Sequence, residues 1–191
     1  MIAFDQIAPT YDSTPNPLLA LEERILTPFL PNMSGLTVAD IGAGTGRWLR
    51  RVSAARTIAI DRSPAMLARA PQPRILADAG SLPLRDASID IVFCTFTLGY
   101  VPSCFAELVR ITGNKLIVTD VHPDAVTRGW SRMAPHVPYA LSDLTHPNLT
   151  RTHLFEPCID EPERPLFASK PHLYEPAREY PAIFIAIWNK Q

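Results

Sequence analysis

The sequence predicts an α/β fold in which short buried strands alternate with helices around a doubly wound, mostly parallel sheet. The first observation behind this prediction is the stretch 36–48, where an apolar run ends in Asp40 and three alternate glycines follow. Two later apolar runs, 57–61 and 74–79, also carry an aspartate at or next to their ends. Open α/β sheets bind ligands where the carboxyl ends of parallel strands meet, so these acids indicate a ligand site at that edge.

The glycine turn after Asp40 indicates a close approach between the backbone and a ligand. Glycine adopts positive φ angles and leaves room beside the backbone, and the first N–H groups of a following helix favour anionic groups. Gly42, Gly44 and Gly46 alternate, whereas the dinucleotide fingerprint is G-x-G-x-x-G, and Arg47 takes the place of its third glycine. No Lys-Ser/Thr pair follows the turn, which excludes a P-loop.

The composition is that of one globular domain, and it argues against several classes of partner. The chain has 191 residues, of which 47% are hydrophobic and 19% charged, enough for one full core. A net charge of −1 gives no basic footprint for nucleic acid or an anionic membrane. Residues 1–5 lack the regions of a signal peptide, and the three cysteines lack metal-ligand spacing. We expect a cytoplasmic protein without a metal.

The elements of the first half follow from apolar periodicity and capping residues. Apolar side chains at helical spacing over 18–29 predict an amphipathic helix that ends before Pro31. A second helix should follow the glycine turn, and a third should begin at Ser63 and Pro64, which are a good N-cap and first residue. The buried side of the second helix is expected to consist of Trp48, Val52 and Ala55.

The second half predicts four more strands. Residues 89–98 form a continuous apolar run, typical of a strand buried on both faces. A helix over 102–111 and a short turn over 111–114 precede a fifth strand at 115–120. The remaining elements are expected to be a strand over 150–159, a proline-bounded helix or irregular segment over 166–177, and a buried strand over 182–188.

The acid-x-G-x-G-x-G turn resembles motif I of the class I S-adenosylmethionine (SAM) dependent methyltransferases, and the resemblance extends along most of the chain. It is closest to the small-molecule branch that includes the ubiquinone- and menaquinone-biosynthesis methyltransferases (methyltransferase type 11-like). The resemblance implies a Rossmann-like, seven-stranded sheet whose last strand is antiparallel. It also divides the single domain into an N-terminal lid and helix (1–31), a SAM-binding core (36–120) and a shortened substrate-side region with the final strands (121–191).

The resemblance also implies a set of cofactor contacts. The backbone at Arg62 and the side chain of Met66 would border the adenine, and Asp78 would accept a hydrogen bond from the adenine amino group. The backbone N–H after Asp78, that of Ala79, would meet a ring nitrogen. The glycine turn and the end of the fourth strand complete the set with Asp40, Gly42, Ala43, Gly44 and Thr95.

The position of Asp61 in the sequence also predicts a role in cofactor binding. It follows Asp40 by 21 residues, about where an acid meets the ribose hydroxyls at the tip of the second strand. A carboxylate accepts from both hydroxyls, and hydrogen bonds to a charged group contribute about 1.5–3 kcal/mol. The alternative is a cap for the next helix, for which Ser63 is better suited.

The N-terminal stretch 4–12 is similar to the F-D-x-x-A-x-x-Y-D segment that lies over the cofactor in this family. By that resemblance, Tyr11 would contact the carboxylate or sulfonium region of SAM. The alternative is that Tyr11 packs an N-terminal arm onto the domain. The residues leave both readings open.

The sequence contains no fixed catalytic motif, which suits a reaction that depends on alignment. Good alignment of the reacting atoms contributes about 7–11 kcal/mol, and a base is needed only when the nucleophile holds a proton. His122 after the fifth strand and Tyr100 after the fourth are the candidate catalytic residues, with His136 and Tyr11 behind them. A lone loop histidine is more often solvated or hydrogen-bonded. Many relatives carry histidines where Gly99 and Tyr100 stand, so that role is not carried over.

We therefore expect a SAM-dependent methyltransferase that acts on a small molecule at O, N or C, as a monomer or homodimer. Aromatic residues near the expected pocket would suit a partly apolar or aromatic substrate. The alternative is a non-catalytic SAM-binding sensor or partner subunit, which the trimmed region after the fifth strand favours slightly. The near-neutral charge argues against a nucleic-acid substrate.

Overall fold

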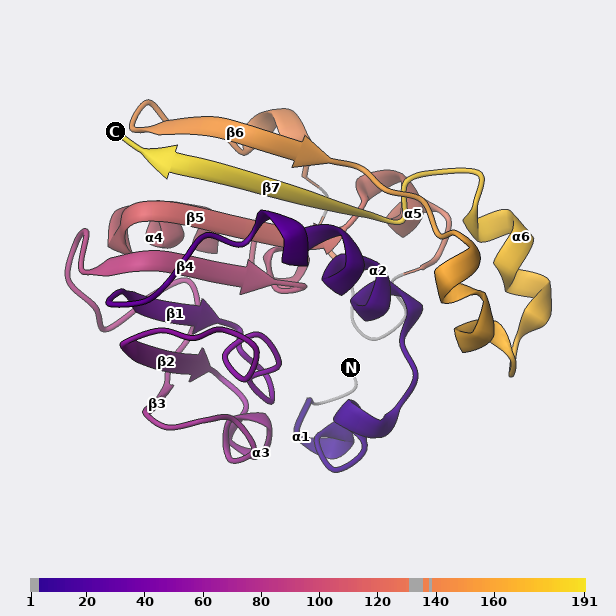
Figure 1. Cartoon of the computed structure of the whole chain (residues 1–191), viewed down its shortest axis with the longest axis horizontal. Helices are drawn as coiled ribbons and strands as arrows, with labels where there is room; N and C mark the ends of the chain where they lie inside the picture. Colours follow the sequence, from indigo (N-terminus) through magenta and orange to yellow (C-terminus); the bar gives the residue numbers. More distant parts are fainter. Residues whose placement is uncertain (1–3, 131–135, 138) are drawn as a thin grey trace.

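One seven-stranded mixed sheet runs through the computed structural model, which describes residues 4–130, 136–137 and 139–191 (Figure 1). The strand order is β3-β2-β1-β4-β5-β7-β6. Strands β1 to β5 pair in parallel, and β7 runs antiparallel between β5 and β6. This confirms the predicted Rossmann-like fold and its antiparallel last strand. The bounds are β1 (Thr37–Ile41), β2 (Arg56–Asp61), β3 (Arg74–Leu76), β4 (Ile89–Thr95), β5 (Thr112–Val121), β6 (Leu149–Phe155) and β7 (Ile183–Lys190).

The helices are short and cover both faces of the sheet, with α2 and α4 on opposite faces (Figure 1). The α-helices are α1 (Phe4–Ile7), α2 (Pro17–Leu26), α3 (Pro64–Leu67), α4 (Cys104–Ile111), α5 (Pro123–Thr127) and α6 (Tyr174–Ala177). The 3₁₀ helices are η1 (Tyr11–Ser13), η2 (Thr27–Phe29), η3 (Leu98–Tyr100), η4 (Leu141–Asp143), η5 (Glu161–Phe167) and η6 (Pro171–Leu173). Within the described part of the chain, no helix has the length and apolar character needed to cross a membrane.

Side chains of the central strands alternate between two separate cores. Phe93 and Ile117 pack with the α2 side, whereas their neighbours Val92 and Leu116 pack with the α4 side. All four are fully buried. Because both faces are covered, these strands appear in the sequence as continuous apolar runs.

Helix α2 forms as the periodicity predicts. The side chain of Asn16 accepts a hydrogen bond from Leu18 N (3.0 Å), and Pro17 occupies the first turn, where it loses no intrahelical bond. The helix ends in η2, before Pro31. Helix α3 begins with Ser63 as its N-cap, also as predicted.

The helix predicted after the glycine turn is wrong. Residues 44–51 form consecutive turns, and Ala55, expected on a buried face, is exposed while Trp48 is buried. The physical reason is that Gly42, Gly44 and Gly46 all have positive φ, with Gly46 at 79°. Left-handed residues interrupt the helical path. The N–H groups of Gly42 and Ala43 donate to Ile60 O, and that of Gly44 donates to the Asp61 carboxylate.

Three predicted strand boundaries also differ. Strand β4 stops at Thr95 because Phe96 has a φ of 51°, which turns the chain into η3. No separate turn precedes β5: the strand begins at Thr112, whose hydroxyl donates to Leu108 O (2.6 Å) at the end of α4. Strand β3 ends at Leu76, so the acid expected at its tip lies in the following loop.

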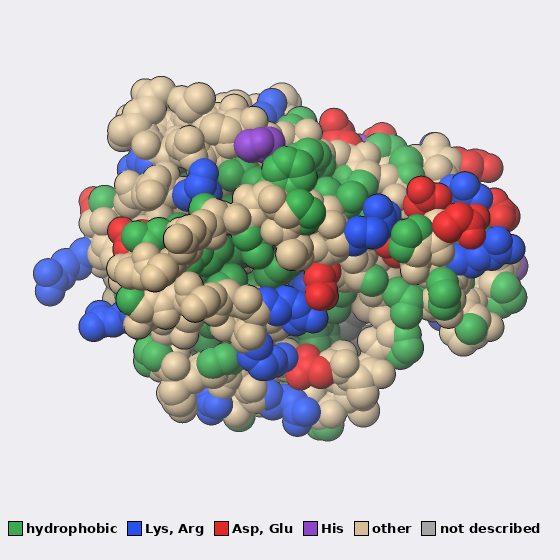
Figure 2. Space-filling view, in the orientation of Figure 1, with side chains coloured by type: hydrophobic (Ala, Val, Ile, Leu, Met, Phe, Trp, Pro, Cys, Tyr) green, Lys and Arg blue, Asp and Glu red, His purple; other side chains and the backbone are tan. Residues whose placement is uncertain are grey.

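The segment after β6, expected as a helix or an irregular stretch, consists mainly of η5, η6 and α6. On its surface, at the right of Figure 2, acidic and basic side chains lie side by side. Arg178 there approaches Asp160, Glu161 and Glu175 within 3.6 Å. The segment is also tied to α2, since Arg24 forms a bidentate ion pair with the buried Glu163.

Candidate functional site

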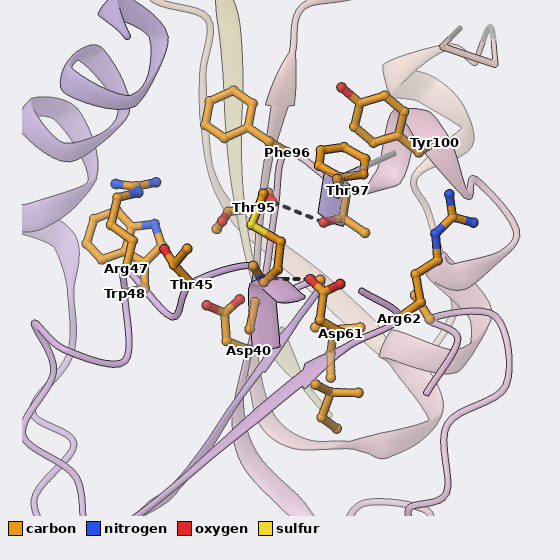
Figure 3. A pocket seen from close by; sticks show the side chains of 18 of the residues that line it. Asp40, Thr45, Arg47, Trp48, Asp61, Arg62, Thr95, Phe96, Thr97 and Tyr100 are labelled. Atoms are coloured by element: carbon orange, nitrogen blue, oxygen red, sulfur yellow. Dashed lines mark hydrogen bonds between the residues drawn. The ribbon is translucent and has the colours of Figure 1, made fainter. Parts of the chain in front are cut away.

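A pocket lies at the carboxyl ends of β1, β2 and β4 and is bordered by the N-terminal segment (Figure 3). Its empty volume is about 880 Å³, including the part open to solvent. The structure brings ten of the eleven predicted cofactor residues together around this pocket. These ten are Tyr11, Asp40, Gly42, Ala43, Gly44, Asp61, Arg62, Met66, Ala79 and Thr95.

Only the middle glycine of the turn leaves open space toward the pocket. A Cβ at Gly42 would collide with the side chain of Thr97, and one at Gly46 would collide with Pro71. These two glycines therefore allow close packing. At Gly44, with a φ of 54°, a Cβ would meet nothing within 4 Å. Gly44 is thus the position where a missing side chain gives a ligand access to the backbone.

Asp61 is held at the tip of β2 by backbone donors. Its Oδ2 accepts from Gly44 N (2.7 Å) and its Oδ1 accepts from Ser63 N (2.8 Å). Burial raises the pKa of this carboxyl, while the N–H groups of Ser63 and Gly44 lower it. Each oxygen keeps a second lone pair, so the oriented carboxylate can accept two further hydrogen bonds. The N-cap of α3 is Ser63, whose Oγ accepts from Met66 N (3.2 Å).

Asp40 at the end of β1 is a buried carboxyl with an unpartnered oxygen, Oδ1. Burial raises its pKa to about 8; Glu22 and Asp61 add to this effect and Arg47 opposes it. A buried polar atom without a partner is costly. This oxygen therefore suits a ligand that brings a donor or a positive charge.

Sequence reasoning missed Arg47, which lines the pocket, and Glu22, which lies behind it as its buried partner. Arg47 Nη2 donates to the carboxylate of Glu22, which also accepts from Thr119 Oγ1. Glu22 is 0% exposed, and Arg47 Nη1 is buried without a partner at the pocket. The available signal was that Glu22 stands four residues after Leu18, on the apolar face of α2.

The N-terminal segment lies over the pocket and is tied to both sides of it. Asp5 Oδ1 accepts from Ser63 Oγ (2.6 Å) and from Ala65 N (3.1 Å) at the start of α3. Asp12 Oδ1 accepts from Thr45 Oγ1 (2.6 Å) in the glycine turn. Between these anchors, Tyr11 lines the pocket, and burial raises the pKa of its phenol, which therefore stays neutral at physiological pH.

Asp78 is the predicted cofactor residue that does not line the pocket. Its side chain is exposed, and Oδ1 accepts from Gly80 N (2.7 Å). The neighbouring Ala77 and Ala79 do line the pocket. The predicted contact between the Asp78 side chain and adenine stays a prediction.

The two predicted catalytic residues differ in position. His122 is 6% exposed and lies outside the pocket lining. Its Nδ1 accepts from Asp124 N (3.1 Å) as the N-cap of α5, and its Nε2 lies 2.9 Å from Glu156 Oε1. Tyr100 does line the pocket (Figure 3). Its ring packs edge-on against that of Phe4 at a centroid distance of 5.5 Å.

Asp120 holds the loop that carries Tyr100. It is fully buried at the end of β5, and burial raises its pKa to about 7. Its carboxylate accepts from Gly99 N (2.6 Å) and from Val121 N (2.7 Å), which fixes η3 against β5.

The described residues contain no group of three His, Cys, Asp or Glu side chains placed to hold a metal ion.

Comparisons with known proteins agree with this arrangement. Residues 39–118 match the family model of the methyltransferase domain. The chain is 28% identical over 183 residues to malonyl-acyl-carrier protein O-methyltransferase of Xylella fastidiosa (strain M23), covering 83% of this chain and 62% of that protein. It is 33% identical over 138 residues to demethylmenaquinone methyltransferase of Renibacterium salmoninarum, covering 63% of this chain and 58% of that one.

A solved structure supports the fold. The SAM-dependent methyltransferase from Mesorhizobium loti superposes with a TM-score of 0.70 at 20% sequence identity, covering 92% of this chain and 100% of that chain. This chain spans less than two thirds of the length of the two curated relatives above. Together, the matches confirm the resemblance to the class I SAM-dependent methyltransferases.

Proposed function

We propose that this chain, a relative of the class I SAM-dependent methyltransferases, transfers the methyl group of SAM to a small-molecule acceptor. The observation that carries the proposal is the pocket wall where Asp40 Oδ1 and Arg47 Nη1 are both buried and unpartnered beside the open backbone of Gly44. An unpaired acid next to an unpaired guanidinium N–H is complementary to a zwitterionic amino-acid group. SAM carries such a group on its methionine end.

The remaining residues of the pocket fit the other parts of SAM. The carboxylate of Asp61, fixed by Gly44 N and Ser63 N, suits the two ribose hydroxyls. The open space at Gly44 lets the ligand pass close to the backbone. Met66 and Ala79, both buried, offer an apolar border for a base. The ammonium would pair with Asp40 and the carboxylate with Arg47.

For methyl transfer, this chain must orient the reacting groups and exclude water from them. SAM, when bound, supplies an activated methyl group on a sulfonium. The rings of Phe4, Phe96 and Tyr100 line one side of the pocket, where they would limit the access of water and orient an acceptor. Because Tyr100 lines this region and His122 does not, we assign contact with the acceptor to Tyr100.

The proposal includes a small-molecule acceptor and a cytoplasmic location. The names of the relatives, malonyl-acyl-carrier protein O-methyltransferase and demethylmenaquinone methyltransferase, support a small-molecule acceptor group. All three cysteines are free, which suits the reducing cytoplasm we expected.

The test is calorimetric titration with SAM, with its demethylated product S-adenosylhomocysteine, and with NADH. Binding of the first two on the order of micromolar, without binding of NADH, is the expected result. Binding of NADH in place of SAM would overturn the proposal, and so would binding of none of the three. Methyl transfer to any member of a panel of hydroxyl, amine and activated-carbon compounds then separates an enzyme from a SAM-binding sensor.

A further inference from the structure

A second pocket adjoins the first and has no role in the site described so far. Its empty volume is about 770 Å³, including the part open to solvent, and it extends along the start of α2 to Val121 and Trp130. The two pockets share one wall, formed by Phe4, Tyr11, Leu19, Phe96 and Tyr100. The second pocket is therefore the immediate neighbour of the first.

Aromatic rings from separate segments surround this space. Phe4 and Tyr11 come from the N-terminal segment, Phe96 and Tyr100 from the loop after β4, and Trp130 from the stretch after α5. Aromatic side chains favour flat aromatic partners in offset or edge-on contact at centroid distances of about 4.5–7 Å. Phe4 and Tyr100 already show such a contact with each other, edge-on.

The charge of the second pocket is as informative as its rings. None of its described lining residues is Lys, Arg, His, Asp or Glu. Asn16 is polar, but its side-chain oxygen already accepts from Leu18 N (3.0 Å) and Leu19 N (3.5 Å) as the N-cap of α2. The indole N–H of Trp130 donates to the hydroxyl of Tyr180. Among these described side chains, an ionised carboxylate or phosphate would find no charged partner, which disfavours its burial there.

We propose that the second pocket binds the methyl acceptor and that this acceptor is an uncharged, flat aromatic compound with a nucleophilic substituent. The inference rests on the proposed function, and it selects one acceptor class among those that small-molecule methyltransferases use. In the transfer, the bond between the acceptor atom and the methyl carbon forms as the methyl–sulfur bond breaks. Sulfur keeps the electron pair, and the proton lost by the acceptor atom passes to water.

Two probes with the same rings and different charge test the proposal. The affinities of 2-naphthol and 2-naphthoate are measured by calorimetry on the full chain saturated with S-adenosylhomocysteine. We expect 2-naphthol to bind at least about tenfold more tightly than 2-naphthoate. Equal affinity, or tighter binding of the carboxylate, would overturn the assignment of an uncharged acceptor.

Variants of Trp130 then locate the probe. Trp130→Ala should weaken binding of 2-naphthol by about tenfold, whereas Trp130→Phe, which loses the bond to Tyr180 and keeps an aromatic ring, should retain most of it. Both variants should bind SAM like the parent chain. Equal effects of the two substitutions would mean that Trp130 acts through its hydrogen bond, and the ring argument would fail.

The same titrations separate this inference from the proposed function. If SAM binds and 2-naphthol does not, the acceptor assignment is wrong and the methyltransferase proposal stands. If 2-naphthol binds with the expected preference and SAM does not, the second pocket binds aromatic compounds but the methyltransferase proposal is wrong. The second pocket then has no role as an acceptor site.

Discussion

The two halves of the site are built in opposite ways. The cofactor half consists of strand ends and one turn, where Gly44 N and Ser63 N hold the carboxylate of Asp61 and the carboxyl of Asp40 is buried. The acceptor half consists of side chains such as Phe4 and Trp130, which come from segments far apart in the chain and carry no charge. Few substitutions are compatible with the cofactor half, because its geometry depends on the backbone. Substitutions in the acceptor half can change which acceptor binds without disturbing the sheet.

Gly44→Val is the substitution with the largest expected effect on this comparison. The added side chain would occupy the open space beside the turn, so we expect SAM affinity to fall below detection by calorimetry. Binding of 2-naphthol should change little, because Gly44 lines only the cofactor pocket. The fold should survive with a strain of about 1–2 kcal/mol from the positive φ of 54°. Thermal unfolding provides the control, and unchanged SAM affinity would remove the glycine turn from the site.

This contrast also explains how much the sequence could predict. Asp40 and Asp61 could be assigned because each follows an apolar strand, and the carboxyl ends of parallel strands converge. Glu22 could not be assigned, since its partners Arg47 and Thr119 lie 25 and 97 residues away along the chain. The helix expected after the turn failed because three positive φ angles override apolar spacing.

Glu22→Gln tests whether the cofactor half depends on its buried ion pair. The substitution leaves Arg47 with a neutral partner, and breaking a buried pair typically costs on the order of 3 kcal/mol of stability. Because Glu22 also raises the pKa of Asp40, the pH dependence of SAM binding should move to lower pH. Urea unfolding measures the first effect and calorimetry at several pH values the second. Glu23→Gln, on an exposed pair with Arg51, is the matched control and should change neither.

Asp61→Ala should weaken SAM by about one to two orders of magnitude, since it removes hydrogen bonds to a charged group. Asp78→Ala is the natural comparison, because sequence reasoning places both acids on the cofactor while only Asp61 lines the pocket. We expect a much smaller loss of SAM affinity for Asp78→Ala. A loss equal to that of Asp61→Ala would mean that the Asp78 side chain turns from Gly80 N toward the adenine when SAM binds.

The pH dependence of SAM binding should reveal Asp40. Its pKa of about 8 in the folded chain lies above the usual 3.8, so the folded state holds a proton that the unfolded state releases. Stability from this group therefore falls as pH rises from about 4 to 8. An ammonium pairs with the ionised form, so SAM affinity should rise with pH toward 8, by up to about tenfold per unit. Asp40→Asn should flatten this rise, and an unchanged slope would contradict the assigned contact.

His122→Ala should have the smallest effect on either half. Both ring nitrogens of His122 are engaged away from the pockets, one with Asp124 N and one with Glu156. We expect turnover within about twofold of the parent chain and a stability loss of about 1 kcal/mol, typical of a removed N-cap. Steady-state kinetics with the best acceptor and urea unfolding measure the two. A fall in kcat without a change in SAM affinity or stability would restore His122 as a base, and would require η3 and α5 to rearrange when the acceptor binds. Tyr100→Phe, at the wall shared by both pockets, is the comparison that decides which of the two predicted catalytic residues touches the acceptor.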